Sequence, residues 1–198
     1  MEKSKLVICD LDGTLFDTRR VNYMAYREAI ERAGLPVVFD YDIYVEKCWG
    51  PTYRGFLPIM GVPENRFEEI HDAKKLYYEE NLKYATENTH LFNIIKAMKN
   101  EYHTAVVTSG SSNSKDILRY FGRLELFDVI FTIDDVKNGK PDPEGFLKAM
   151  EYFKVKPENT IIFEDSDVGL VAARKTGASI CVVDDNNLSV YVHLYFYC

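Results

Sequence analysis

The chain has 198 residues, a formal net charge of −7, 46% hydrophobic residues and 28% charged residues. This length is enough for one full hydrophobic core and a small additional domain. An acidic chain without a basic stripe is poorly suited to bind nucleic acid or an anionic membrane surface. The apolar run near the N-terminus is too short for a signal peptide or a membrane span, so we expect a cytoplasmic protein.

Five short apolar runs, rich in Val and Ile, are predicted to form buried parallel strands because they are nearly continuous rather than alternating. In chain order these runs are 6–9, 104–108, 129–133, 160–164 and 180–183. Helical patterns flank them at 91–99, 111–124, 143–153 and 167–177. The alternation of strands and helices predicts an α/β fold built on a doubly wound parallel sheet.

The interval that follows the first strand is much longer than a simple crossover needs and is helical in character. We therefore predict a small helical domain, 18–88, inserted into a core domain made of 1–17 and 89–198. Asp17 and Thr18 are expected to mark the hinge and the start of the first inserted helix, where both residue types are favoured.

The aromatic C-terminal tail, 189–198, could be an edge strand, a packed last helix or a dimer contact. The four cysteines are widely scattered and show no metal-ligand spacing. Cys9 and Cys181 lie inside apolar runs, so we expect them to be buried thiols in a reducing compartment.

Polar residues follow four of the predicted strands. They are, in chain order, Asp10 and Asp12, then Thr108, Ser109 and Gly110, then Lys140, and finally Glu164 and Asp165. In open α/β sheets, ligands bind beyond the carboxyl ends of the strands. Two carboxylates one residue apart raise each other's cost of ionisation unless a cation lies between them. We therefore expect a site for Mg²⁺, which prefers carboxylate ligands.

The acids of this cluster suggest phosphoryl transfer. Asp10, nearest the strand end, could attack a phosphorus atom and hold the phosphoryl group as an acyl phosphate. Asp12 could protonate the leaving oxygen and later activate water. Asp165, helped by Glu164, would complete the metal shell, and the metal would offset the repulsion between nucleophile and phosphate.

The remaining residues of the cluster suit a bound phosphoryl group. Thr108 and the backbone N–H groups near Ser109 and Gly110 could bind its oxygens, while Lys140 would offset the charge that accumulates there. In the inserted domain, Arg54 could bind a substrate carboxylate or a second phosphate, or it could be a solvated surface arginine.

Four motifs, taken together, resemble those of the haloacid dehalogenase-like superfamily in the same order. They are DLDGT (10–14), TSG (108–110), GKPDPE (139–144) and FEDSDVG (163–169). The resemblance implies a Rossmann-like core with an α-helical cap inserted after the first motif. It also implies an Asp nucleophile, an Asp acid/base, and Mg²⁺ held by Asp10, the backbone carbonyl of Asp12, and Asp165.

The order and the inserted domain look like the phosphoglycolate phosphatase and β-phosphoglucomutase branch. Dehalogenases of the superfamily lack the second acid of the first motif, so Asp12 favours phosphoryl transfer. Similar mutases tend to carry a His on the first cap helix, four residues after the hinge Thr or Ser. Asn22 stands at that position here. This favours a phosphatase that hydrolyses a small phosphate monoester.

Two other functions stay open at this stage. One is a phosphomutase acting on a sugar phosphate, and the other is a noncatalytic binding domain that keeps the motifs. For the phosphatase and for the phosphomutase alike, we expect a small phosphorylated metabolite as partner, no nucleic acid, no membrane, and a monomer or weak homodimer.

The histidines form no cluster, and none is predicted to be catalytic. Asp142 could hold Lys140 in place or cap the next helix, whereas Asp134 and Asp135 are expected to solvate a loop.

Overall fold

The computed structural model describes residues 3–49, 52–110, 114–184 and 189–191. The chain divides into two compact units. One is formed by 1–17 together with 87–198, and the other by 18–86. Where the chain passes between them, β2 (Phe16–Asp17) pairs with β3 (Thr86–Glu87). No helix among the described residues is both long enough and apolar enough to cross a membrane.

The first unit is built on a sheet with strand order β5-β4-β1-β6-β7-β8 in the described part of the chain. Its strands are β1 (Lys5–Cys9), β4 (Tyr102–Val107), β5 (Val129–Phe131), β6 (Thr160–Glu164), β7 (Ser179–Asp184) and β8 (Ser189–Tyr191). The first five are parallel, and β8 runs antiparallel to β7 at the edge. The predicted strands are therefore present, and the α/β prediction is confirmed.

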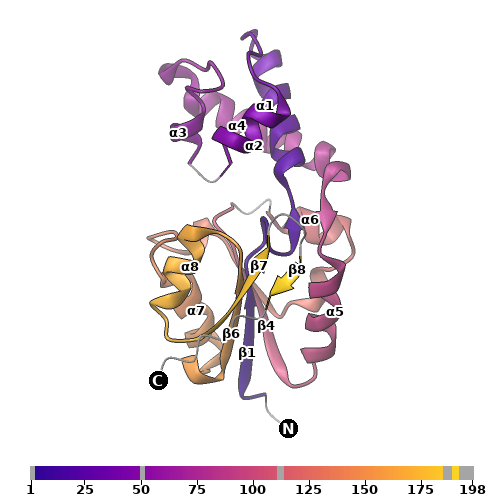
Figure 1. Cartoon of the computed structure of the whole chain (residues 1–198), viewed down its shortest axis with the longest axis vertical. Helices are drawn as coiled ribbons and strands as arrows, with labels where there is room; N and C mark the ends of the chain where they lie inside the picture. The colour runs from indigo at the N-terminus through magenta and orange to yellow at the C-terminus, as the bar shows by residue number, and fades with distance from the viewer. Residues whose placement is uncertain (1–2, 50–51, 111–113, 185–188, 192–198) are drawn as a thin grey trace. The chain divides into compact units, whose positions relative to one another are not determined.

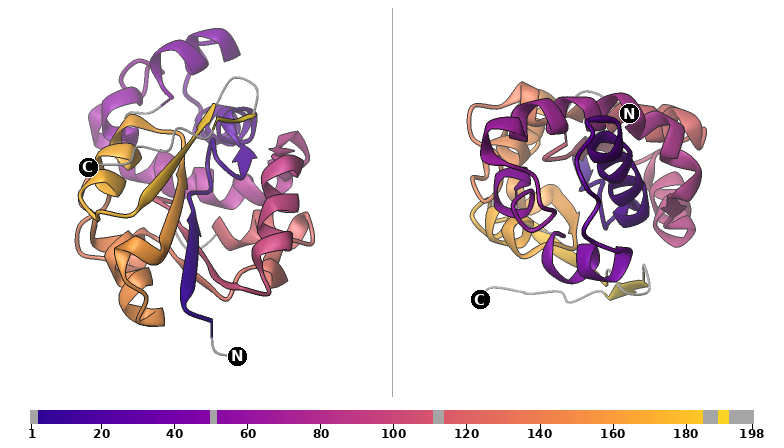
Figure 2. Two further views of the ribbon diagram at one scale, coloured as in Figure 1. Left: turned by 60° about the horizontal axis from the view of Figure 1, so that its bottom comes forward. Right: turned by 90° about the horizontal axis from the view of Figure 1, so that it is seen from above.

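Helices cover both faces of this sheet, as a doubly wound fold requires (Figure 1). The helices are α5 (Thr89–Met98), α6 (Ser114–Tyr120), α7 (Glu144–Phe153) and α8 (Asp167–Arg174). In Figure 1 and Figure 2, α5 and α6 lie on one side of the sheet, whereas α7 and α8 lie on the other. Leu6, Val7, Ile8 and Cys9 are fully buried because β1 is covered on both faces.

Strand order changes direction next to β1. From β1 the chain proceeds outward through β4 and β5, and it then returns to place β6 and β7 on the other side of β1. Cys9 is level with Phe163 in the register, so the residues that follow β1 and β6 emerge side by side. This reversal is the place where open α/β sheets form their binding crevice.

Two sequence predictions about this unit need correction. The third strand ends at Phe131 rather than 133, because Thr132 and Asp135 form a capping box around a 3₁₀ turn, Ile133–Asp135. Asp135 is thus a cap and not a solvated loop residue.

Among the cysteines, Cys9 and Cys181 are buried, as predicted. Of the tail, 189–191 forms the edge strand β8, and 192–198 lies outside the described residues.

The second unit is helical and has a hydrophobic core of its own. Its helices are α1 (Arg19–Arg32), α2 (Tyr41–Lys47), α3 (Tyr53–Phe56) and α4 (Phe67–Tyr78), with 3₁₀ turns at Glu64–Arg66 and Glu79–Tyr84. Asp40 caps α2 by accepting a hydrogen bond from the Ile43 amide at 2.8 Å. Buried Ile30, Leu57, Met60 and Ile70 show that this unit has a closed apolar interior.

His71 of α4 is packed between two tyrosines of the helical unit. Its Nδ1 lies 2.9 Å from the Tyr26 hydroxyl, and its ring stacks on Tyr53 with 3.9 Å between centroids and 11° between planes. Burial, followed by the charges of Lys75 and Lys74, lowers the pKa of His71 to about 4. The folded unit therefore keeps this imidazole neutral in conditions where an unfolded chain would protonate it.

This environment predicts that the helical unit loses stability in mild acid. An unfolded histidine takes up a proton near pH 6.5, whereas folded His71 does so near pH 4, so unfolding is favoured progressively as pH falls between these values. The single tryptophan, Trp49, belongs to this unit and reports its unfolding. We expect the urea midpoint to fall less between pH 7 and pH 5 in His71→Gln than in the native chain.

His90→Gln provides the control, because His90 is exposed on the first turn of α5. That variant should retain the native pH dependence of the tryptophan signal. Identical pH dependence in His71→Gln and the native chain would show that His71 does not contribute.

Candidate active site

Asp10 lies at the carboxyl end of β1, beside the strand reversal. Its amide extends the sheet ladder by donating to the Phe163 carbonyl at 2.9 Å, and the residue is 6% exposed. Beyond it, the chain turns sharply, because the amides of Leu15 and Phe16 both donate to the Leu11 carbonyl at 3.0 Å. The turn returns the chain toward the carboxyl end of β6.

Gly13 allows this turn to approach β6 closely. Its φ is +93°, a region that favours glycine, and a Cβ at this position would lie 2.0 Å from Oδ2 of Asp165. Thr14, fully buried, follows at once and donates from Oγ1 to Oδ1 of Asp165 at 2.6 Å. The first motif therefore fixes the orientation of the Asp165 carboxylate as well as supplying Asp10.

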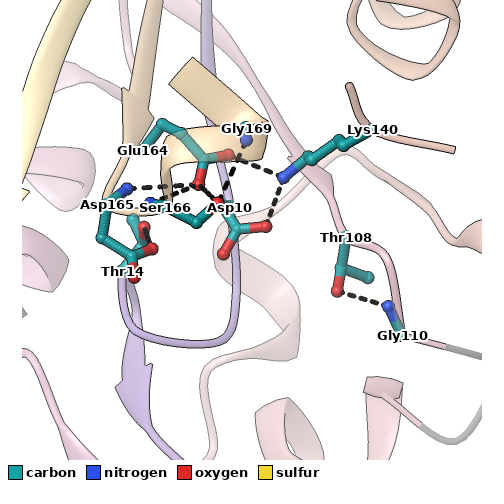
Figure 3. A network of polar contacts seen from close by, with 9 residues as sticks. All are labelled: Asp10, Thr14, Thr108, Gly110, Lys140, Glu164, Asp165, Ser166 and Gly169. Atoms are coloured by element: carbon teal, nitrogen blue, oxygen red, sulfur yellow. Dashed lines mark hydrogen bonds and ion pairs between the residues drawn. The ribbon is translucent and has the colours of Figure 1, made fainter. Parts of the chain in front are cut away.

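Lys140 lies between two of the predicted site acids (Figure 3). Its Nζ is 2.5 Å from Oδ1 of Asp10 and 2.7 Å from Oε2 of Glu164. The side chains are 7% exposed for Lys140, 8% for Asp10 and 0% for Glu164, so these charges are almost completely removed from water. Short bonds between buried opposite charges of this kind are strong and directional.

Glu164 is held by donors from the start of α8. Its Oε1 accepts from the Asp165 amide at 3.2 Å, the Ser166 amide at 3.0 Å and the Ser166 hydroxyl at 2.8 Å. Ser166 also caps α8, since its Oγ accepts from the Gly169 amide at 3.1 Å. A Cβ on Gly169 would lie 2.1 Å from the Glu164 carboxyl carbon, so this helix position has no space for a side chain.

The resulting cluster holds more negative than positive charge. Carboxylate oxygens of Asp10, Glu164 and Asp165 lie within 4.8 Å of one another, and Lys140 supplies one positive charge among them. Burial, followed by Glu164, raises the pKa of Asp10 well above its usual range and that of Asp165 to about 7. Burial lowers the pKa of Lys140, but Asp10 and Glu164 more than reverse this effect. Such a donor set fits a hard divalent cation.

The predicted phosphate-binding residues lie at the end of the neighbouring strand, β4. Thr108 is buried, and its Oγ1 accepts from the Gly110 amide at 3.0 Å, which shapes the turn (Figure 3). Ser109, between them, is exposed. β4 pairs with β1 in parallel, so this turn and Asp10 share one edge of the sheet.

Asp12 and Arg54 are placed differently from the buried acids. Asp12 is half-buried and lies within the turn after β1, where it forms a bridge to Phe16. Arg54 belongs to α3 of the helical unit, where its guanidinium pairs with Glu68 at 2.5 Å. Asp142 accepts from the Glu144 amide at 3.0 Å at the start of α7, in agreement with the capping alternative.

Sequence reasoning missed two residues that support the cluster. Thr14 orients Asp165, and Ser166 joins Glu164 to the start of α8. Ser166 could have been found, since a serine directly before the helical pattern at 167–177 is a typical N-cap. Thr14 could not, because its partner lies far along the chain.

Comparison with known proteins agrees with this geometry. The family model described as "Haloacid dehalogenase-like hydrolase" matches residues 7–183, almost the whole chain. The chain belongs to the haloacid dehalogenase-like hydrolase family. This membership confirms the predicted family and the prediction that the chain is a hydrolase.

The relatives of this haloacid dehalogenase-like hydrolase include differently named enzymes. It is 34% identical to the phosphorylated carbohydrates phosphatase of Thermotoga maritima over 86% of this chain and 81% of that protein. It is 29% identical to the β-phosphoglucomutase of Bacillus subtilis over 87% of this chain and 80% of that protein. A solved structure of CbbY from Rhodobacter sphaeroides, in complex with phosphate, has a TM-score of 0.78 and 25% identity, and the match covers 91% of this chain and 86% of that one.

The bond from Thr14 to Asp165 gives a testable expectation. Thr14→Val keeps the shape but removes the donor, so the Asp165 carboxylate loses the bond that orients it. We expect the affinity for Mg²⁺, measured by calorimetry, to fall about 10-fold to 100-fold. Thr14→Ser keeps the hydroxyl and should remain within about threefold of the native affinity. Equal Mg²⁺ affinity in the valine variant and the native chain would contradict this role.

Proposed function

We propose that this hydrolase is a Mg²⁺-dependent phosphatase that hydrolyses a small phosphate monoester through an aspartyl-phosphate on Asp10. The observation that supports it most is the placement of Asp10. This buried carboxylate lies at the strand reversal, beside two further acids and Lys140. A noncatalytic domain would have no evident use for so costly a group of buried charges.

The cation would be held by the carboxylates of Asp10 and Asp165 with the backbone carbonyl of Asp12. Glu164, which was predicted to help, already accepts hydrogen bonds on both carboxylate oxygens, so we assign it chiefly to Lys140 and α8. When bound, Mg²⁺ would supply positive charge that offsets repulsion between Asp10 and an anionic phosphate.

The proposed reaction has two balanced steps. In the first, an Asp10 oxygen forms a bond to phosphorus while the bond from phosphorus to the leaving oxygen breaks, and Asp12 gives that oxygen its proton. In the second, water attacks the same phosphorus, Asp12 takes a proton from it, and the bond from Asp10 to phosphorus breaks. The products are the alcohol and inorganic phosphate, and both acids return to their starting states.

The turn after β4 would bind the transferred group. The Thr108 hydroxyl and the backbone amides near Ser109 and Gly110 would donate to phosphoryl oxygens at the same sheet edge as Asp10. Lys140, already beside Asp10, would offset the negative charge that grows during the transfer.

The helical unit would act as a cap that selects the substrate and excludes water. Arg54 is its predicted anion-binding residue. Because Glu68 and the Tyr53 ring already contact its guanidinium, a substrate anion would have to displace or share Glu68. The name of the Thermotoga maritima relative supports a phosphorylated carbohydrate as the substrate class.

The predicted limits of the inserted helical domain, 18–88, and the predicted cytoplasmic location of the protein remain predictions.

A phosphomutase acting on a sugar phosphate is the second candidate, supported by the relative named β-phosphoglucomutase. The residue at the position where such mutases tend to carry His argues against it. Asn22 donates from Nδ2 to the Thr18 carbonyl at 3.0 Å, a bond within its own helix start. An amide used in this way offers no group that could exchange a proton with a sugar hydroxyl at neutral pH.

Phosphate release from a panel of sugar phosphates and other phosphorylated metabolites would test the phosphatase. We expect turnover with Mg²⁺, none with EDTA, and a decrease of about 10³-fold or more in Asp10→Asn, which keeps size but removes the nucleophile. Asp72→Asn, an exposed site in the helical unit, should retain native activity. Turnover that survives EDTA or Asp10→Asn would rule out the proposed mechanism.

The mutase candidate predicts a different product. It requires a bisphosphate activator and yields an isomerised sugar phosphate with little free phosphate, which ³¹P NMR distinguishes from hydrolysis. We expect hydrolysis alone in the native chain. Isomerisation that depends on a bisphosphate would favour the mutase instead.

A further inference from the structure

Lys140 reaches the acids from an irregular segment. The chain between β5 and α7, 132–143, has no strand, and it must place a long flexible side chain between Asp10 and Glu164. A lysine held in one geometry loses side-chain entropy, and a loose backbone at its base would add to that cost. What holds this backbone is therefore part of how the site is built.

Glu144, the first residue of α7, holds the segment just before Lys140. Its Oε1 accepts from the Lys137 amide at 2.8 Å, and its Oε2 accepts from the Asn138 amide at 2.9 Å and from the Asn138 side chain at 3.2 Å. The hydrogen bond from the Lys137 amide is the largest of the effects that lower the pKa of Glu144. The carboxylate is therefore ionised at neutral pH.

Glu144 is not needed as a cap for its own helix. An acid in the first turn ordinarily serves the helix amides and dipole. Here Asp142 takes that place, because it accepts from the Glu144 amide at 3.0 Å. The Glu144 carboxylate instead points back to the upstream loop, where it binds the two consecutive amides that lead to Gly139 and Lys140.

Other side chains hold the two ends of the segment. Lys148 of α7 bonds to the Asp135 carbonyl, and Lys175, just after α8, donates to the Pro141 carbonyl at 2.9 Å. These two carbonyls flank the stretch that Glu144 binds, one on each side of it. Glu144 is thus the middle anchor, and it makes more of these hydrogen bonds than either lysine.

We propose that Glu144 is a positioning residue that sets the place of Lys140 Nζ between Asp10 and Glu164. This inference rests on the proposed function where its test measures the rate of phosphoryl transfer in Glu144 variants. The Asn138 amide that Glu144 binds lies only two residues before Lys140, so this carboxylate restricts the φ and ψ angles of the chain that leads to the lysine. Without it, Lys140 would still be present but would be held at its short distances for a smaller fraction of the time.

Steady-state kinetics of Glu144→Ala and Glu144→Gln would test this role. We expect kcat to fall about tenfold in the alanine variant, with KM changed by less than about threefold, because the lysine acts mainly as charge develops. The glutamine variant keeps one acceptor and should be intermediate, which also covers an alanine variant that folds poorly. Glu151→Gln, exposed two turns later on α7, should retain native kinetics.

A double-mutant cycle separates positioning from general stabilisation. If Glu144 acts through Lys140, the alanine substitution should have almost no further effect on kcat in a Lys140→Met background. An equal decrease in both backgrounds, or native kcat in Glu144→Ala, would overturn the proposal.

Trypsin provides a readout that does not depend on activity. It can cut after Lys137 but not after Lys140, which precedes Pro141. We expect cleavage after Lys137, identified by mass spectrometry, to be about tenfold faster in Glu144→Ala than in Glu151→Gln. Unchanged cleavage would overturn the proposal even with an altered kcat. A native chain with no phosphatase activity, yet with this change in cleavage, would contradict the proposed function and leave the anchoring by Glu144 supported.

Discussion

The ion pairs of Lys140 with Asp10 and Glu164 are the interaction on which the core unit depends. Removing one partner from such a buried group typically costs about 3–5 kcal/mol, because the remaining charge is left uncompensated. The surrounding residues are arranged to keep these charges close. Gly13 lets the turn after β1 approach Asp165, and Gly169 lets α8 approach Glu164. Ser166 donates two hydrogen bonds to the Glu164 carboxylate.

The fold was largely predictable because buried parallel strands are short, continuous apolar runs. The site was predictable in outline, since polar residues after successive strands must meet at one edge of the sheet. The detailed contacts were not, because they join distant segments. Thr14 and Asp165 are 151 residues apart, and Lys140 and Asp10 are 130 apart. The role of Asp135 does not follow from the sequence, because its capping box with Thr132 replaces an expected strand end by a 3₁₀ turn.

The two units differ in the chemistry of their side chains. The core unit contains the buried acids, the lysine and the turn after β4, all set by sheet register. The helical unit has a separate aromatic core, in which Tyr26, His71 and Tyr53 form one stack. Its surface can therefore vary without disturbing the register that places Asp10. This separation agrees with a family whose members are named for different reactions, among them a phosphorylated carbohydrates phosphatase and a β-phosphoglucomutase.

The strand order also has a consequence for synthesis on the ribosome. The helical unit is one continuous stretch, 18–86, and its interior can close as soon as that stretch has emerged. β1 gains its neighbour on one side when β4 emerges, but its other neighbour is β6, which comes only after β5 and α7. Until residues 160–165 leave the exit tunnel, Asp10 has neither Glu164 nor Asp165 beside it. The growing chain therefore carries a closed helical unit before the Asp10 carboxylate has its buried partners, and the acidic cluster is completed only when β6 and Asp165 are in place.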